Sequence, residues 1–216
     1  MCLLIVSCFA FLALHLGISG TPLGELLQNS LSESLYLSVY SLLSLGSLGV
    51  VIYGYVQVPH VGFIWVPSVL AYKVAKVFML LALVTIVMGA LVKTPTAVMS
   101  ERVLDYEVSG LLKITRQSIL WSVLLFARVH LLANRDYASI LFFGTFVLLS
   151  FFGMLSMDQG RRQKSDPKWL IFMDKTSMVS FAALLRGRLR FRLADINWLS
   201  SIVDFTLYAS IYCYMA

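Results

Sequence analysis

The stretch SILWSVLLFARVHLLANRDYASILFFGTFVLLSFFGMLS, residues 118–156, decides the fold. It contains two apolar runs, 118–133 and 137–156, which are separated only by Asn134-Arg135-Asp136. A helix needs about 20 apolar residues to cross a hydrocarbon core about 30 Å thick, so the second run is long enough and the first is short. Because the link is so short, the sequence predicts two membrane helices in a tight antiparallel hairpin.

Apolar runs of the same kind lie on both sides of this hairpin, at 2–19, 35–56, 68–92 and 196–215. Of the 216 residues 59% are hydrophobic and 13% are charged, whereas soluble domains carry about 25% charged residues. This composition excludes a soluble domain and a disordered chain, and three cysteines are too few for a disulfide scaffold. The sequence therefore predicts an all-α, polytopic transmembrane helix bundle of about six spans (five to seven), forming a single membrane domain, 1–216.

The positive charge is distributed unevenly among the loops. Of the 17 lysines and arginines, four follow the third predicted span and nine follow the fifth. Cytoplasmic loops carry such an excess, so these two loops are predicted to face the cytoplasm or an organelle matrix, and both termini the opposite side. Since topology accounts for the net charge of +6, the expected partners are the lipid bilayer and other membrane subunits, not nucleic acid.

The chain after Met157 is strongly basic and includes a moderately apolar piece, 169–185, that has no clean span. An interfacial position and a membrane-embedded, re-entrant one both stay open for this piece. Four arginines follow it and are predicted to anchor the chain to anionic lipid headgroups, with an acidic protein surface as the alternative: Arg186, Arg188, Arg190 and Arg192.

Ionisable side chains inside predicted spans are the candidates for chemistry, because burying a charge there costs about 2.5–3.5 kcal/mol on insertion scales. They are His15, Arg128, His130 and Asp204. His130 and Asn134 are one helical turn apart and share a face, so His130 is either a haem or metal ligand or an interhelical hydrogen-bonding group. Arg128 points away from His130 and is expected to extend to the interface.

The remaining sequence carries no soluble-enzyme signature, since Walker, GxSxG, HExxH and paired CxxC motifs are all absent. Between Pro59 and Pro67 a short loop holds His60, interpreted as an ordinary exposed histidine, and Trp65, interpreted as an interface anchor.

Residues 110–146, GLLKITRQSILWSVLLFARVHLLANRDYASILFFGTF, resemble the signature of the NnrU membrane proteins. In that family an Arg-His-Pro motif is followed by a helix that ends in His-Leu-Leu-Ala-Asn-Gly-Asp. The segments 11–15 and 36–55 resemble the first two family helices, and 176–188 (TSMVSFAALLRGR) resembles a segment of the related zeta-carotene isomerases. The resemblance covers most of residues 1–190 and leaves 196–215 as an extra C-terminal helix.

This resemblance implies a haem centre and a redox chemistry. The isomerases use haem b, held by membrane histidines, to move a polyene double bond, and NnrU is linked to denitrification and nitric oxide metabolism. Carried over to this chain, the two histidines are His15 and His130, and the resemblance implies that His130 is the ligand of the haem iron. The neighbouring motif maps to Arg116, Gln117, Asn134 and Asp136.

The chain departs from the family at two positions, because the His-Pro of the motif is Gln117-Ser118 here and the glycine after Asn134 is Arg135. Gln117 is expected at the depth of His15, whereas His130 lies about 13 residues, or about 20 Å, further along its helix. The two histidines are therefore predicted to differ in depth by two turns or more. Amides are poor iron ligands beside imidazole, so the ligand set is degenerate.

Two functions stay open. One is a haem-dependent isomerase or oxidoreductase with this degenerate ligand set. The other is a non-catalytic scaffold subunit of a larger respiratory or photosynthetic complex, in a bacterial inner membrane or a mitochondrial or plastid membrane. A small-molecule carrier is disfavoured, because the spans lack paired charges and an inverted repeat.

Overall fold

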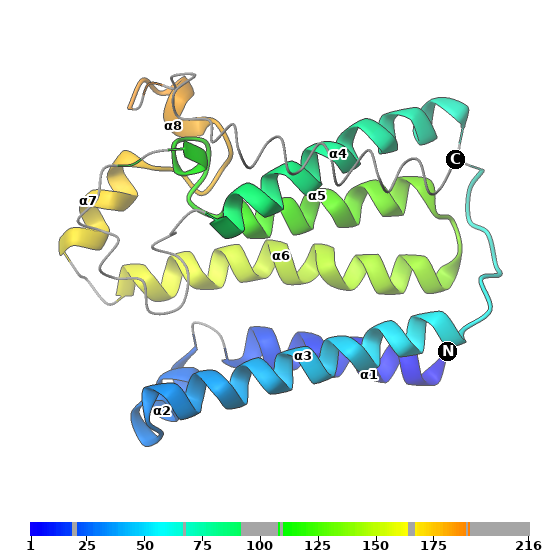
Figure 1. Ribbon diagram of the computed structural model, residues 1–216, viewed down its shortest axis with the longest axis horizontal. Helices are drawn as coiled ribbons and strands as arrows, with labels where there is room; N and C mark the ends of the chain where they lie inside the picture. The colour runs from blue at the N-terminus through cyan, green and yellow to red at the C-terminus, as the bar shows by residue number, and fades with distance from the viewer. Residues whose placement is uncertain are drawn as a thin grey trace. The chain divides into compact units, whose positions relative to one another are not determined.

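The computed structural model describes residues 1–18, 21–66, 68–91, 108, 110–163, 167–188 and 190, and every regular element in these ranges is a helix (Figure 1). In chain order they are α1 (Cys2–Ile18), α2 (Pro22–Ser30), α3 (Glu33–Gln57), α4 (Val69–Leu91), the short 3-10 helix η2 (Gly110–Lys113), α5 (Ser118–Ala133), α6 (Tyr137–Gln163), α7 (Pro167–Lys175) and α8 (Ala182–Leu185). The all-α prediction is confirmed for the described part of the chain.

Five of the six predicted apolar runs coincide with helices, namely α1, α3, α4, α5 and α6. Within the described ranges, three helical stretches are long and apolar enough to cross a membrane: Ser34–Gln57, Val69–Gly89 and Tyr137–Gln163. A fourth span results if α1 and α2 together form one bent span, and α5 is a shorter apolar helix. The protein thus has the helices of an integral membrane protein. Six spans stay a prediction, and the run 196–215 lies outside the described residues.

The polar link predicted between the first two runs contains a helix, α2. Its start carries the usual signals, because Thr21 is the N-cap, its hydroxyl oxygen accepts a hydrogen bond from the Gly24 amide at 3.3 Å, and proline follows at the first helical position. A Cβ on Gly24 would lie 2.0 Å from the carbonyl oxygen of Ile18, so only glycine lets α2 begin this close to α1.

The ambiguous piece 169–185 is a broken segment. Helix α7 ends at Lys175, and α8 begins only after Phe181, whose φ of 64° is left-handed. A left-handed residue interrupts a right-handed helix, so no continuous helix long enough to span a bilayer forms here. Met178 accepts hydrogen bonds at its carbonyl from the Trp121 indole (2.8 Å) and the Thr115 hydroxyl (2.9 Å), which tie the segment to the start of α5.

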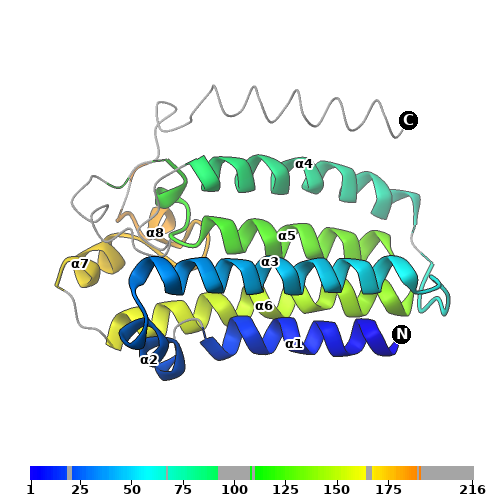
Figure 2. The same cartoon turned by 60° about the horizontal axis from the view of Figure 1, so that its bottom comes forward.

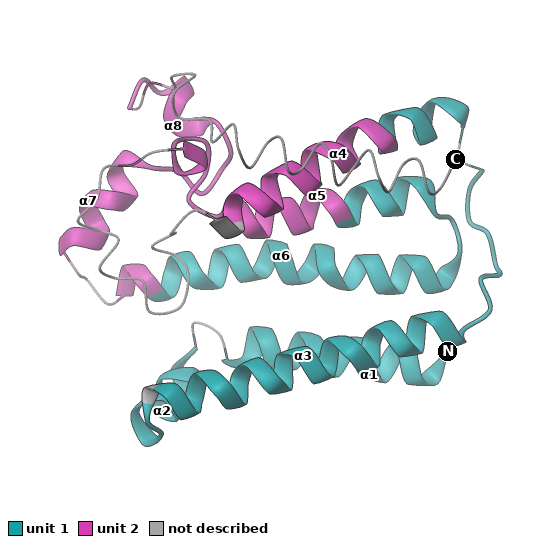
Figure 3. Ribbon diagram, in the orientation of Figure 1, with its two compact units in different colours: residues 1–75, 127–160 teal, residues 76–126, 161–216 magenta. Residues whose placement is uncertain are grey.

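The chain divides into two compact units, shown in teal and magenta in Figure 3. Unit 1 comprises Met1–Ala75 and Ala127–Gly160, and unit 2 comprises Lys76–Phe126 and Arg161–Ala216. In unit 1, α1 packs along α3, and both lie beside α6 (Figure 2). Its buried core is Leu4, Cys8, Phe11, Val51, Val58, Ala127, Ala138, Phe142 and Phe143.

Unit 2 is held by polar contacts as well as by apolar ones. The Ser122 hydroxyl of α5 donates to the Thr85 hydroxyl of α4 at 2.8 Å, the type of contact that joins helices where water is excluded. Its buried apolar cluster lies around α7 and consists of Leu112, Trp169, Phe172 and Met173. The prediction of a single membrane domain stays a prediction.

Candidate functional site

The turn between α5 and α6 carries a buried carboxylate, Asp136, which caps α6. One carboxylate oxygen accepts the Ser139 amide at 2.9 Å, and the other accepts the Ser139 hydroxyl at 2.7 Å. An aspartate at the N-cap satisfies amides that the first turn of a helix leaves without a partner. The sequence Asp136-Tyr137-Ala138-Ser139 therefore fixes the start of α6 by local chemistry.

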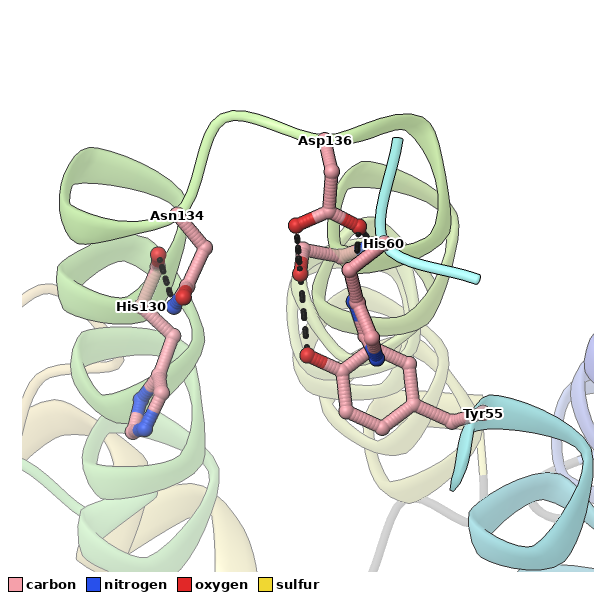
Figure 4. A network of polar contacts seen from close by, with 6 residues as sticks. Tyr55, His60, His130, Asn134 and Asp136 are labelled. Carbon is pink, nitrogen blue, oxygen red and sulfur yellow. Dashed lines mark hydrogen bonds and ion pairs between the residues drawn. The ribbon is translucent and has the colours of Figure 1, made fainter. Parts of the chain in front are cut away.

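Two further side chains from the end of α3 and the loop after it complete a network around Asp136 (Figure 4). The His60 Nδ1 lies 2.9 Å from an Asp136 carboxylate oxygen, and the Tyr55 hydroxyl lies 2.9 Å from the Ser139 hydroxyl. Because a carboxylate only accepts, His60 Nδ1 donates; because the Ser139 hydroxyl donates to Asp136, Tyr55 donates to Ser139. The hydrogen bonds run in one direction, from Tyr55 through Ser139 to Asp136 and from His60 to Asp136.

The two ends of the network differ in solvent exposure. The side chain of His60 is 43% exposed, whereas that of Asp136 is 8% exposed. Burial opposes ionisation of Asp136, but the hydrogen bonds from Ser139 and His60 and the charge of protonated His60 outweigh it, so the pKa of Asp136 lies below its usual value. Asp136 is therefore a carboxylate at neutral pH and holds His60 with Nδ1 protonated.

The loop that carries His60 is fixed to the same turn by three further contacts. The Ile64 amide donates to the Arg135 carbonyl at 3.0 Å, and the Arg135 guanidinium lies 4.3 Å from the centre of the Phe63 ring. Gly62 has a φ of 79° and lies so close to Tyr137 that an added Cβ would be 2.2 Å from that ring. The residues 58–66 that the structure describes thus form a strap, hereafter the α3–α4 strap, across the start of α6.

His130 lies in α5 with its ring stacked on Phe143, 4.4 Å between ring centres. The side-chain amide of Asn134 donates to the backbone carbonyl of His130 at 2.9 Å, so this motif residue caps the end of α5 (Figure 4). Arg128 is exposed, and its position at the membrane interface stays a prediction.

His15 is half-buried near the end of α1. Its Nδ1 lies 2.9 Å from the Phe11 carbonyl oxygen of its own helix, and its ring contacts Phe11 (4.2 Å) and Tyr40 (6.0 Å). Because a carbonyl only accepts, Nδ1 donates, and in the neutral imidazole Nε2 carries the lone pair that binds a metal.

A continuous chain of phenylalanine rings lies between the two histidines within unit 1. Ring-centre distances are 4.2 Å from His15 to Phe11, 5.7 Å to Phe146, 5.1 Å to Phe142, 5.0 Å to Phe143 and 4.4 Å to His130. His15 is four residues beyond Phe11, and Phe143 is three residues before Phe146, so at 1.5 Å per residue the histidines differ in depth by about 10 Å. The structure does not bring His15 and His130 together.

Arg116 and Gln117 are both buried in unit 2, directly before α5. The Arg116 amide donates to the Ser177 carbonyl at 3.0 Å, and the Thr115 hydroxyl accepts from the Gln117 amide at 3.2 Å. These contacts tie the motif to the broken segment after α7.

The basic segment is described up to residue 190. Arg186 and Arg190 are exposed, while Arg188 donates to the Asp174 carbonyl. Arg192 and Asp204 lie outside the described residues, and the anchoring of these arginines to lipid stays a prediction.

Sequence reasoning missed the partnership of His60, Tyr55 and Ser139 with Asp136. Part of it was detectable, because Asp136 three residues before Ser139 at the start of an apolar run is an N-cap pattern. The contribution of His60 and Tyr55 had no local signal, since they lie 76 and 84 residues from their partners.

Chemically, the network presents an imidazole oriented by a carboxylate at a partly exposed position, an arrangement that can accept and release protons. Among the described residues, no group of three or more His, Cys, Asp or Glu side chains could hold a metal ion. The site is therefore a polar cap on an apolar helical unit.

Three apolar helical stretches of spanning length in the described residues, one of which begins at the turn capped by Asp136, define a membrane helical protein. The family model described as "NnrU protein" matches residues 3–214, nearly the whole chain, and the chain belongs to the NnrU family. No curated protein and no solved structure matches the sequence.

Proposed function

We propose that this NnrU-family protein is a non-catalytic membrane scaffold that keeps the helical framework without a bis-histidine haem. The observation that carries the proposal is the chain of four phenylalanine rings between His15 and His130. The interior of unit 1 is packed with aromatic side chains where two ligands would have to face each other.

A haem with two axial histidines needs both imidazoles on opposite faces of one porphyrin, at the same iron. His15 and His130 differ in depth by about two helical turns, and Phe142 and Phe146 lie between them in the aromatic chain. The residues present therefore do not fit a haem held by this pair. Gln117, where the family motif carries histidine, supplies no replacement, because an amide is a poor iron ligand.

A scaffold acts through the chains that it packs against, so its partners are other membrane subunits of a respiratory or photosynthetic type. The test is an absorbance spectrum with pyridine haemochrome on protein purified in mild detergent after haem-replete expression. We expect less than stoichiometric haem and the same spectrum for His15→Ala and His130→Ala. One haem per chain that disappears in both variants would overturn the proposal.

A gain-of-function variant sharpens this test. If the cofactor was lost with the motif histidine, Gln117→His, alone or with Ser118→Pro, should increase bound haem, whereas Gln117→Asn should not. Wild-type protein that co-purifies with further membrane chains, but not with haem, would support the scaffold.

A second candidate is a haem protein with one histidine ligand, and a specific contact favours His15 for it. The Nδ1 of His15 donates to the Phe11 carbonyl, which directs the metal-binding lone pair to Nε2 and orients the ring, as outer hydrogen bonds do for metal-bound histidines. Haem bound there would supply a redox-active iron for an isomerisation or oxidoreduction. Haem that is lost in His15→Ala but kept in His130→Ala would establish this alternative and contradict His130 as the ligand.

A further inference from the structure

The α3–α4 strap exposes an apolar surface that neither the family nor the proposed function explains. The exposed fractions are 64% for Val61, 59% for Phe63, 54% for Ile64 and 83% for Val66. No Asp, Glu, Lys or Arg occurs between positions 58 and 68. In a membrane protein such contiguous exposed apolar side chains mark a surface that meets lipid or another protein.

The depth of the strap is set by the helices it joins. The apolar stretches Ser34–Gln57 and Val69–Gly89 are both long enough to cross a membrane, so a segment between them lies at the boundary of the hydrocarbon. The start of α6, which the strap covers, is the end of another stretch of spanning length. Figure 1 shows the strap, in cyan, leaving the end of α3.

The composition of the strap and its neighbours suits that boundary. Trp65 in the strap and the exposed Tyr137 beside it are the amphipathic aromatic residues that gather at membrane interfaces. Arg135, next to Phe63, supplies a cation at the same level, where lipid phosphates lie.

The strap is also held in place. Its contacts to the start of α6 comprise the hydrogen bond from His60 to Asp136 and that from Ile64 to Arg135. These two hydrogen bonds involve the backbone and one polar side chain, and the side chains of Val61, Phe63, Ile64 and Val66 remain exposed. An ordered backbone with outward apolar side chains suits insertion between headgroups, where water and the headgroups themselves can bond the remaining polar backbone groups.

We propose that the α3–α4 strap is a lipid-interface element, whose exposed apolar side chains lie among the headgroups of the leaflet at the start of α6. The His60–Asp136 hydrogen bond keeps it at that depth. By the charge distribution of the sequence this is the non-cytoplasmic leaflet.

The test uses the full chain in phosphatidylcholine nanodiscs, with Trp65 as the only tryptophan after Trp121→Phe, Trp169→Phe and Trp198→Phe. We expect blue-shifted Trp65 emission, stronger quenching by a headgroup nitroxide than by lipid brominated deep in the acyl chain, and iodide quenching several-fold weaker than for free tryptophan amide. Iodide quenching as strong as that of the free amide would place the strap in water. Protection from iodide and from both lipid quenchers would mean that protein covers it; either result overturns the proposal.

Should the triple variant fail to fold, 5-fluorotryptophan in the wild-type chain gives the same answer by fluorine NMR. The Trp65 resonance, assigned with Trp65→Phe, should broaden with a headgroup nitroxide and not with an aqueous gadolinium chelate. Broadening by the chelate alone would contradict the proposal.

The role of the anchor is tested with a matched pair. His60→Ala removes the donor to Asp136 and should increase iodide quenching of Trp65 several-fold, while His60→Asn, which keeps a side-chain N–H near the position of Nδ1, should restore protection. Equal protection in both variants would show that His60 does not hold the strap.

Discussion

His60 and Asp136 are 76 residues apart in the sequence, yet Nδ1 of His60 lies 2.9 Å from a carboxylate oxygen of Asp136. This hydrogen bond connects the segment after α3 to the first turn of α6, within unit 1. Asp136 therefore caps its own helix and also makes a tertiary contact.

Removing the negative charge of Asp136 should destabilise the protein. Asp136→Asn keeps the shape of the side chain but weakens its hydrogen bonds from Ser139 and His60. Because hydrogen bonds to charged groups contribute about 1.5–3 kcal/mol each, we expect the free energy of unfolding to fall by about 2 kcal/mol. Denaturant titration in mild detergent measures it. Asp174→Asn, at an exposed carboxylate of α7, is the control and should change the free energy of unfolding by less than about 0.5 kcal/mol. Equal effects of the two variants would contradict this account.

Low pH should abolish the contribution of Asp136 to the free energy of unfolding. Its folded pKa lies below the unfolded value of about 3.9, so its contribution is present above about pH 4 and is lost as the pH falls through the folded value. The difference in unfolding free energy between wild type and Asp136→Asn should therefore be present at about pH 5 and shrink as the pH falls below about 4. A difference that persists unchanged at about pH 2.5 would mean that the pKa is not linked to folding.

Gly62→Ala should destabilise the strap, because φ at this position is 79° and the new Cβ would meet the Tyr137 ring at 2.2 Å. The left-handed backbone alone costs a residue with a Cβ about 1–2 kcal/mol. Gly46→Ala is the matched control, since nothing lies within 4 Å of its Cβ and alanine favours a helix interior by about 0.5–1 kcal/mol. Combining Gly62→Ala with Tyr137→Ala removes the clashing ring, so Gly62→Ala should then cost only the free energy of the left-handed backbone.

Close packing of α1 on α3 should depend on Gly54. Its Cβ would lie 3.2 Å from the Leu4 Cα, and small residues allow such backbone approaches between membrane helices. Gly54→Leu should reduce the free energy of unfolding by about 1–3 kcal/mol through overpacking, whereas Gly49→Leu on the same helix, with open space around it, should be nearly neutral. Similar thermal shifts for the two would show that this approach does not contribute to stability.

Both termini are predicted to lie on the non-cytoplasmic side, because 13 of 17 basic residues follow the third and fifth predicted spans. A tag at either end should resist protease added from the cytoplasmic or matrix side of sealed vesicles and be cut after permeabilisation. Cleavage of the C-terminal tag alone in sealed vesicles would mean that the number of spans is odd.

The sequence by itself determined the long apolar helices of this protein. Within a bilayer the backbone must satisfy its hydrogen bonds locally, so an apolar run of sufficient length becomes a helix; α1, α3, α4, α5 and α6 follow this rule. It also determined the family, because the NnrU family model matches residues 3–214. The helix α2 was missed because its composition is polar, although Thr21 and Pro22 signal its start.

Only the tertiary structure decided what the polar and aromatic side chains do. The pattern of an apolar helix does not specify which face meets which neighbour, because almost every face is apolar. The approach of His60 and Tyr55 to the cap of α6, and the phenylalanine chain between His15 and His130, depend on the rotation and depth of α1, α3, α5 and α6 in unit 1. The rotation and depth of the helices are set by packing between segments distant in sequence. The candidate site could therefore be recognised only from the packed structure.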